Sequence, residues 1–334
     1  MNQQKSDLTW KNVWDNAKDS QKNENWPSLF LKGICMGTAD IIPGVSGGTV
    51  AFITGIYQNL LDAIASFNQD FFKNIFLFKF KKAISLIPIK FLIPLAAGIF
   101  TAIISTAQFM HFLMKYYPLY TWSLFFGLIC SSVVIVYKEI NNTKNSSNSI
   151  LNFTLIIIGI IFSYFVVGFI PIKTTNASWF IFLSGFISIC AMILPGLSGA
   201  FILLILGKYY YVTTALKNPF DLENISIILT FVCGAAMGLL SFSRVLQYFL
   251  KNYRSQTIAI LTGFMIGALR KVWPWKEIIE TKIIRGKTYI IQEMNIWPPE
   301  VNTQFYISLS LIITGFCLVI FIEKIAKQQK KLSL

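Results

Sequence analysis

The chain has 334 residues, of which 54% are hydrophobic and 13% are charged. This composition is typical of an integral membrane protein and excludes an ordinary soluble domain. The net charge of +14 does not indicate nucleic-acid binding, because the lysines and arginines lie almost entirely in the polar segments between apolar runs, where they set membrane topology.

Eight apolar runs follow a polar segment at residues 1–28. Since one crossing needs about 20 apolar residues, the runs at 29–64 and 178–212 are too long for a single helix. Each is interrupted by Pro and Gly, in PGVSGG at 43–48 and PGLSGA at 195–200, which predicts a re-entrant pair of half-length helices. The other runs predict transmembrane helices at 88–113, 119–137, 150–170, 225–250, 256–273 and 304–323.

The two halves of the chain repeat one another. A shift of 152 residues places Ser46-Gly47 on Ser198-Gly199, and a shift of 136 places Gly98 on Gly234. We therefore expect a duplication in which each half is a re-entrant hairpin followed by three transmembrane helices. The predicted units are a first repeat at 29–172, a second repeat at 173–325 and a basic cytoplasmic tail at 326–334.

The positive charges predict the orientation. The N-terminal segment, the lysine-rich loop at 73–82 and the C-terminal tail all fall in the cytoplasm if the first hairpin returns to its own side of the membrane. Three crossings per half then turn the second repeat upside down, leaving the loop 274–303 outside. Within this loop, KIIRGKTYII at 282–291 could form a β-hairpin. The fold class is thus an all-α integral membrane protein with the inverted repeats and broken helices of secondary transporters.

The broken segments are candidate anion sites. A helix that restarts after Pro-Gly presents unpaired N–H groups and the positive end of its dipole, which suit a phosphate. Close helix packing through small residues is the alternative, but two related copies favour a site. The candidate phosphate-binding residues are Ser46, Gly47, Gly48, Thr49, Ser198 and Gly199.

Charged residues within membrane spans are functional candidates because their burial is costly. Arg244 is a candidate phosphate ligand, with snorkelling to the interface as the alternative. Asp40 could exchange a coupling ion, pair with Arg244 or cap the broken helix. Arg270 and Lys271 could attract anionic headgroups, although a topogenic role is as well supported. His111, at a helix end, is expected to be interfacial.

Catalysis is the less favoured reading. Gly44-Val45-Ser46-Gly47 has the form used by intramembrane serine proteases, which need a histidine at the serine. The single histidine, His111, is predicted near the external surface, and a protease has no use for the second copy at 196–199. We expect no catalytic residue, metal or cofactor.

The broken segments, together with SFSRVLQYFLKNY at 241–253 and LTGFMIGALRKVWPW at 261–275, resemble the polyprenyl-phosphate transporter (PopT-type) family. This resemblance covers residues 33–275. It implies a flippase of the cytoplasmic membrane that returns undecaprenyl phosphate from the outer to the inner leaflet for reuse in cell-envelope synthesis.

Several points stay open alongside the resemblance. A transporter of a small soluble anion and a non-transporting lipid-binding scaffold are the alternative functions. The sequence also leaves open whether a proton or a sodium ion is coupled to transport and whether the protein forms a homo-oligomer.

Overall fold

The computed structural model describes residues 25–41, 46–141, 149–169, 174–216, 220–284 and 287–332, and most of these residues are helical. Pro43, Gly44 and the side chain of His111 lie outside the described part. In the first half of the chain the helices are α2 (Trp26–Ile41), α3 (Gly47–Ile53), α4 (Tyr57–Ala65), α5 (Gln69–Phe76), α6 (Phe80–Ser85), α7 (Ile89–Tyr116), α8 (Pro118–Asn141) and α9 (Ser149–Val166).

The second half adds six helices and two strands among the described residues. These elements are α10 (Ser178–Ile193), α11 (Gly199–Ile205), α12 (Tyr209–Ala215), α13 (Leu222–Asn252), α14 (Arg254–Val272), β1 (Lys276–Ile284), β2 (Lys287–Asn295) and α15 (Thr303–Leu332). The strands pair antiparallel, so the predicted β-hairpin is confirmed, while its turn residues Arg285 and Gly286 lie outside the described part. Helices α5 and α6, between the predicted hairpin at 29–64 and the predicted crossing at 88–113, are additions to the predicted architecture.

Within the described part of the chain, five helices are long and apolar enough to cross a membrane, at 89–106, 118–140, 149–166, 222–252 and 303–321, which agrees with a mostly helical multi-pass membrane protein. Helix α14, in the expected crossing 256–273, is not among the five. It packs against both α8 and α9 and buries polar residues such as Ser255 and Thr262. A helix surrounded by protein needs less hydrophobicity than one that faces lipid.

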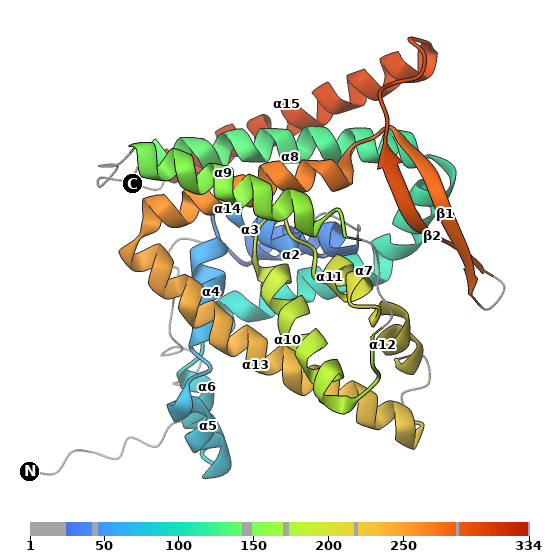
Figure 1. The fold of residues 1–334 in the computed structure, drawn as a ribbon. Coiled ribbons are helices and arrows are strands. Elements are labelled where there is room, and N and C mark those ends of the chain that lie inside the picture. Colours follow the sequence, from blue (N-terminus) through green and yellow to red (C-terminus); the bar gives the residue numbers. More distant parts are fainter. Residues whose placement is uncertain are drawn as a thin grey trace, which may run out of the picture.

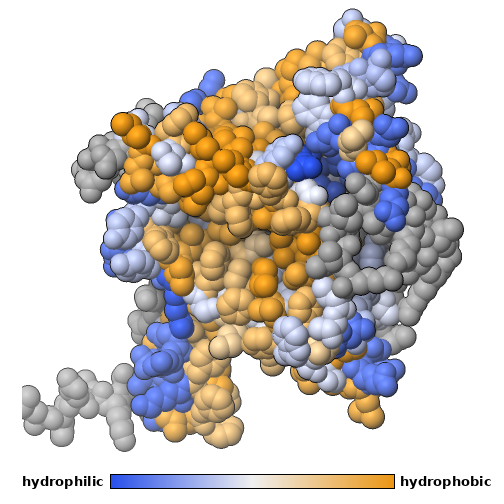
Figure 2. All heavy atoms as spheres, viewed as in Figure 1, coloured by the Kyte–Doolittle hydropathy of each residue, from blue (hydrophilic) through white to orange (hydrophobic). Residues whose placement is uncertain are grey.

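The long helices run broadly from one side of the molecule to the other (Figure 1). The junction of α13 with α14 and the end of α15 lie on the left in this view, whereas the β-hairpin lies on the right. Hydrophobic side chains cover much of the visible face between these sides, and hydrophilic residues gather beside the β-hairpin and around α5 and α6 (Figure 2). This distribution is the one that a bilayer requires.

The helix pairs α2–α7 and α10–α13 cross at equivalent positions. A Cβ atom on Gly33 would collide with the carbonyl oxygen of Leu95, and one on Gly185 would collide with that of Phe231. Gly33 and Gly185 are 152 residues apart, and Leu95 and Phe231 are 136 apart, the two shifts seen in the sequence. The same close contact of backbones therefore occurs once in each half.

The pairs α8–α15 and α14–α9 repeat in the same way. A Cβ atom on Gly127 would collide with the carbonyl oxygen of Ile312, and one on Gly263 with that of Ile156. Each of these pairs joins a helix of one half to a helix of the other. The two halves are therefore interlocked.

Candidate functional site

The first break, PGVSGG at 43–48, leads into helix α3. The backbone amides at the start of α3 already have hydrogen-bond partners. Ser46 is the N-cap of α3, and its Oγ accepts a hydrogen bond from the Gly48 N–H at 3.1 Å. The Gly47 N–H donates to Asp40 Oδ1 at 2.7 Å, and the Thr49 N–H donates to the Ser46 carbonyl at 2.9 Å. Three of the four amides expected to be free thus have partners, because the turn supplies its own capping groups. Asp40 caps the broken helix, which was one of the three roles considered for it.

The two breaks meet through hydrogen bonds. Ser46 Oγ lies 3.2 Å from the Met192 carbonyl oxygen and 3.4 Å from that of Leu194. The Tyr57 hydroxyl donates to the Ile193 carbonyl at 3.0 Å. These acceptors lie at the carboxyl end of α10, where helical carbonyls lack partners within the helix. Ser46 and Tyr57 of the first broken segment therefore cap the end of α10.

One hydrogen bond is donated by the second break and accepted by the first. The Gly196 N–H donates to Thr49 Oγ1 at 2.9 Å. Ser46, Thr49 and Ser198 are all buried, with exposed fractions of 2%, 4% and 8%. The contact between the breaks is thus closed to solvent and made of neutral donors and acceptors, which must be satisfied at this depth.

The second break is built differently from the first. Ser198 Oγ accepts from the Phe201 N–H at 3.4 Å, and the Gly199 carbonyl accepts from Ser188 Oγ at 2.6 Å. Gly196 has φ +88° and lies against the backbone of Met265 in α14. Only glycine adopts this conformation at little cost, so the turn can rest directly on α14.

Arg244 is placed away from these bonds. It is exposed and donates from Nη2 to the Phe67 carbonyl at 3.0 Å, just beyond α4. One turn further along α13, Gln247 donates to Asp62 of α4. No contact between Arg244 and either break, or between Arg244 and Asp40, occurs among the described residues. Its role as a phosphate ligand stays a prediction.

Arg270 and Lys271 have different surroundings. The Arg270 guanidinium stacks on the Tyr164 ring, 4.2 Å from its centroid, and donates to the Tyr164 carbonyl at 2.9 Å. Lys271 Nζ lies 4.8 Å from the centroid of the Phe201 ring. Because Ser198 caps the amide of Phe201, Lys271 stands beside the second break. Arg270 instead ties α14 to α9.

Asp62 and Lys208 are charged residues within the predicted spans that were not singled out from the sequence. Both fall inside the predicted hairpins at 29–64 and 178–212, close to their ends. A charged side chain at such a place can reach water, so its charge alone does not indicate a function. Lys208 is 1% exposed. It donates to Asn176 Oδ1 at 2.6 Å and to the Thr174 carbonyl at 3.1 Å.

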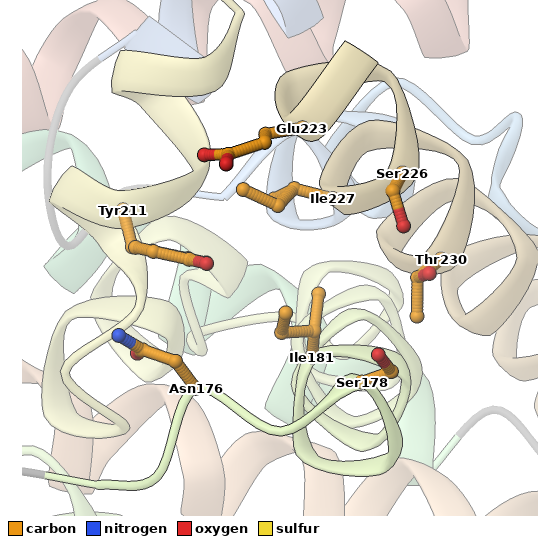
Figure 3. Close-up of a pocket in the computed structure, with 8 residues that line it drawn as sticks. All are labelled: Asn176, Ser178, Ile181, Tyr211, Glu223, Ser226, Ile227 and Thr230. Carbon is orange, nitrogen blue, oxygen red and sulfur yellow. The ribbon is translucent and has the colours of Figure 1, made fainter.

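A pocket of about 290 Å³ lies beside this lysine, between α10, α12 and α13. The Tyr211 hydroxyl and the side chains of Ile181 and Ile227 point into it, and Glu223 lies at one edge (Figure 3). Its walls mix hydroxyl, carboxylate and isoleucine groups, so it does not select an anion. No group of three potential metal ligands occurs among the residues described.

Taken as a class, the chain is a multi-pass membrane protein whose two broken helical segments contact one another inside the helix bundle. It matches the undecaprenyl phosphate translocase-like family over residues 36–289, and the chain belongs to that family.

Two curated relatives are similar over most of their length. The polyprenyl-phosphate transporter of Vibrio cholerae is 40% identical over 320 residues, which cover 92% of this chain and 99% of the relative. The polyprenyl-phosphate transporter of Staphylococcus aureus is 29% identical over 257 residues, covering 73% of this chain and 85% of the relative. No solved structure matches the chain. The resemblance seen in the sequence is therefore confirmed at the level of the family.

Proposed function

We propose that this protein moves polyprenyl phosphate, such as undecaprenyl phosphate, from the outer to the inner leaflet of the cytoplasmic membrane. The names of both relatives support the substrate class and support transport rather than catalysis. The observation that carries the proposal is the contact between the two breaks. Non-helical backbone at membrane depth occurs only where it is buried in protein or lines a cavity, and in secondary transporters such paired breaks form the substrate site.

The repeated packing supports an inverted-repeat architecture with two re-entrant hairpins. Gly33 and Gly185 make the same close contact in their respective halves, as do Gly127 and Gly263. Two interlocked and related halves can rock against one another, which is the usual basis of alternating access. In the proposal, the phosphate binds at Ser46–Thr49 and Ser198–Gly199 and displaces the hydrogen bonds that Ser46 and Thr49 now make to residues 192–196.

The ends of the two hairpins differ in how closely they pack against the long helices, which supports entry from the predicted external side although the contact between the breaks is itself closed to solvent. Helix α4 packs against α13, held by Gln247 on Asp62 and by Arg244 on the Phe67 carbonyl. Among the described residues, its counterpart α12 shows no comparable packing against α7, the counterpart of α13. The predicted cytoplasmic side is therefore closed and the predicted external side looser, as loading from the outer leaflet requires.

Transbilayer movement of undecaprenyl phosphate in liposomes tests the proposal directly. We expect wild-type protein to accelerate this movement. Arg244→Gln should slow the movement at least about tenfold, because a hydrogen bond to a charged group contributes about 1.5–3 kcal/mol. Lys251→Gln, a change of the same charge on the same helix, is the matched control and should retain the wild-type rate.

The competing functions give different results in the same assay. Excess inorganic phosphate should have little effect on a lipid carrier, whereas a transporter of small soluble anions would be inhibited and would accumulate labelled phosphate. A lipid-binding scaffold would bind the lipid without moving it. Folded wild-type protein that fails to accelerate movement would refute the proposed function. Imposed proton and sodium gradients then identify any coupling ion.

A further inference from the structure

The base of the β-hairpin carries a cluster of three charged side chains, Lys271, Lys276 and Glu293. Lys276 Nζ and Lys271 Nζ lie 3.2 Å and 3.4 Å from the same oxygen, Oε2 of Glu293. The side chains are largely removed from solvent, with Lys276 8% exposed and Lys271 and Glu293 23% and 22% exposed. One carboxylate oxygen thus holds two cations that come from α14 and β1.

Further contacts with the α14 backbone and with two aromatic rings hold the cluster in place. Lys276 Nζ also donates to the Lys271 carbonyl at 2.7 Å and lies 4.2 Å from the centroid of the Trp122 ring in α8. Lys271 faces the ring of Phe201, whose amide is capped by Ser198 of the second break. The two lysines are therefore held in a geometry suited to an anion, at the outer end of a predicted transport site.

The charges in this cluster do not balance. Two lysines share one carboxylate, and the neighbouring Arg270 is directed to Tyr164 on α9. Burial lowers the pKa of Lys276 to about 8 in spite of Glu293, with the charge of Lys271 adding to the effect. The two lysines hold the pKa of Glu293 below its usual range. A phosphate monoester, with nearly two negative charges and three acceptor oxygens, matches two lysines better than a single carboxylate does.

We infer that Lys271 and Lys276 receive the phosphate monoester headgroup on the external side, and that Glu293 occupies this site as an internal competitor when it is empty. Arrival of the phosphate displaces the carboxylate and removes the ionic contact between β2 and α14, leaving the hydrogen bond from Asn295 Nδ2 to the Arg270 carbonyl. The inference rests on the proposed function and extends it. Lys271, predicted to attract anionic headgroups, forms a phosphate-binding site together with Lys276, and the β-hairpin covers this site.

Equilibrium binding of farnesyl phosphate to the purified full chain in nanodiscs tests this assignment. Glu293→Gln keeps the size of the side chain and removes the competing charge, so it should bind about tenfold more tightly than wild type. Lys276→Gln should bind about tenfold more weakly, and Lys276→Arg should restore binding. Glu277→Gln removes the same charge from an exposed position on β1 and should leave the affinity unchanged.

The pH dependence provides a second readout. Wild-type affinity should fall as the pH rises above about 8, because Lys276 loses its charge there. The Lys276→Arg variant should not show this fall, since arginine stays charged. Farnesol and inorganic phosphate, tested in parallel, separate recognition of a lipid phosphate from binding of the tail or of free phosphate.

A purely structural ion cluster predicts the opposite result. In that case Glu293→Gln would bind farnesyl phosphate no more tightly than wild type and would unfold at a lower temperature, and Lys276→Gln would bind normally; either binding result overturns the assignment. If wild type moves undecaprenyl phosphate while these variants all bind alike, this site is wrong and the proposed function stands. Tighter binding by Glu293→Gln in a protein that fails to move the lipid would support the site and refute the function.

Discussion

The two breaks share a sequence pattern but differ in their partners. In the first break, Asp40 and Ser46 bond the new helix's own amides, and the Ser46 hydroxyl reaches across to the carbonyls of α10. In the second break, Ser198 caps only its own helix, and Gly196 rests on Met265 of α14. The first break carries a carboxylate, whereas the second has the cation of Lys271 beside it.

This difference shows how one scaffold can serve two purposes. The first break acts mainly as a donor that holds the end of α10, and its carboxylate at Asp40 opposes a bound anion. The second break has a cation within reach and no acidic side chain bonded to it among the described residues. An anion is therefore expected to favour the second break, and substitutions in the two breaks should have unequal effects.

The largest difference is expected between Gly196→Ala and Gly55→Ala. Both glycines have positive φ, +88° and +75°, but a Cβ on Gly196 would lie 2.7 Å from Met265 Cα, whereas one on Gly55 would meet nothing within 4 Å. Each variant should lose about 1–2 kcal/mol for the left-handed conformation, and Gly196→Ala about 1–3 kcal/mol more for overpacking. Reversible unfolding in mixed micelles measures both. Equal losses would mean that the second break does not rest on α14 as described.

A smaller difference should separate Ser46→Ala from Ser198→Ala. Ser46 both caps α3 and bonds the carbonyls of α10, so its loss should cost about 2 kcal/mol. Ser198 makes one long cap bond of 3.4 Å, and its loss should cost about 0.5 kcal/mol. The same unfolding measurement applies. A larger loss for Ser198→Ala would contradict the bonding pattern between the breaks.

A small effect on stability is also expected for Asp40→Asn. The asparagine oxygen can still accept from the Gly47 N–H, and only the charge-assisted part of the bond is lost, about 0.5–1 kcal/mol. Transport distinguishes the roles that the sequence left open. If Asp40 only caps α3, the response of lipid movement to an imposed proton gradient should be unchanged in this variant. Loss of that response would assign proton coupling to Asp40.

The sequence predicted the membrane class, the broken segments and the β-hairpin, because each depends on local composition. Apolar runs of sufficient length become helices in a bilayer, Pro-Gly interrupts them, and alternation around Arg285-Gly286 favours paired strands. The recurrence of glycines at fixed shifts predicted a duplication, and the structure adds that glycines related by these shifts lie at equivalent helix crossings, where two backbones approach closely.

The hydrogen-bond partners of the candidate residues could not be predicted from local composition. The sequence predicted free amides at the first break, but Asp40 and Ser46 satisfy most of them. It singled out Arg244 as a phosphate ligand, and the fold places Arg244 on the Phe67 carbonyl. It passed over Lys276 and Glu293, which are 17 residues apart in an expected loop and become neighbours through strand pairing.

The sequence by itself thus determined the class of the protein and the places where its helices break, because hydrophobicity and backbone geometry act over a few residues. Only the tertiary structure decided which carbonyls face Ser46 and which carboxylate lies between Lys271 and Lys276. Those contacts join segments up to 148 residues apart, and buried polar groups take whichever partner the packing brings within about 3 Å.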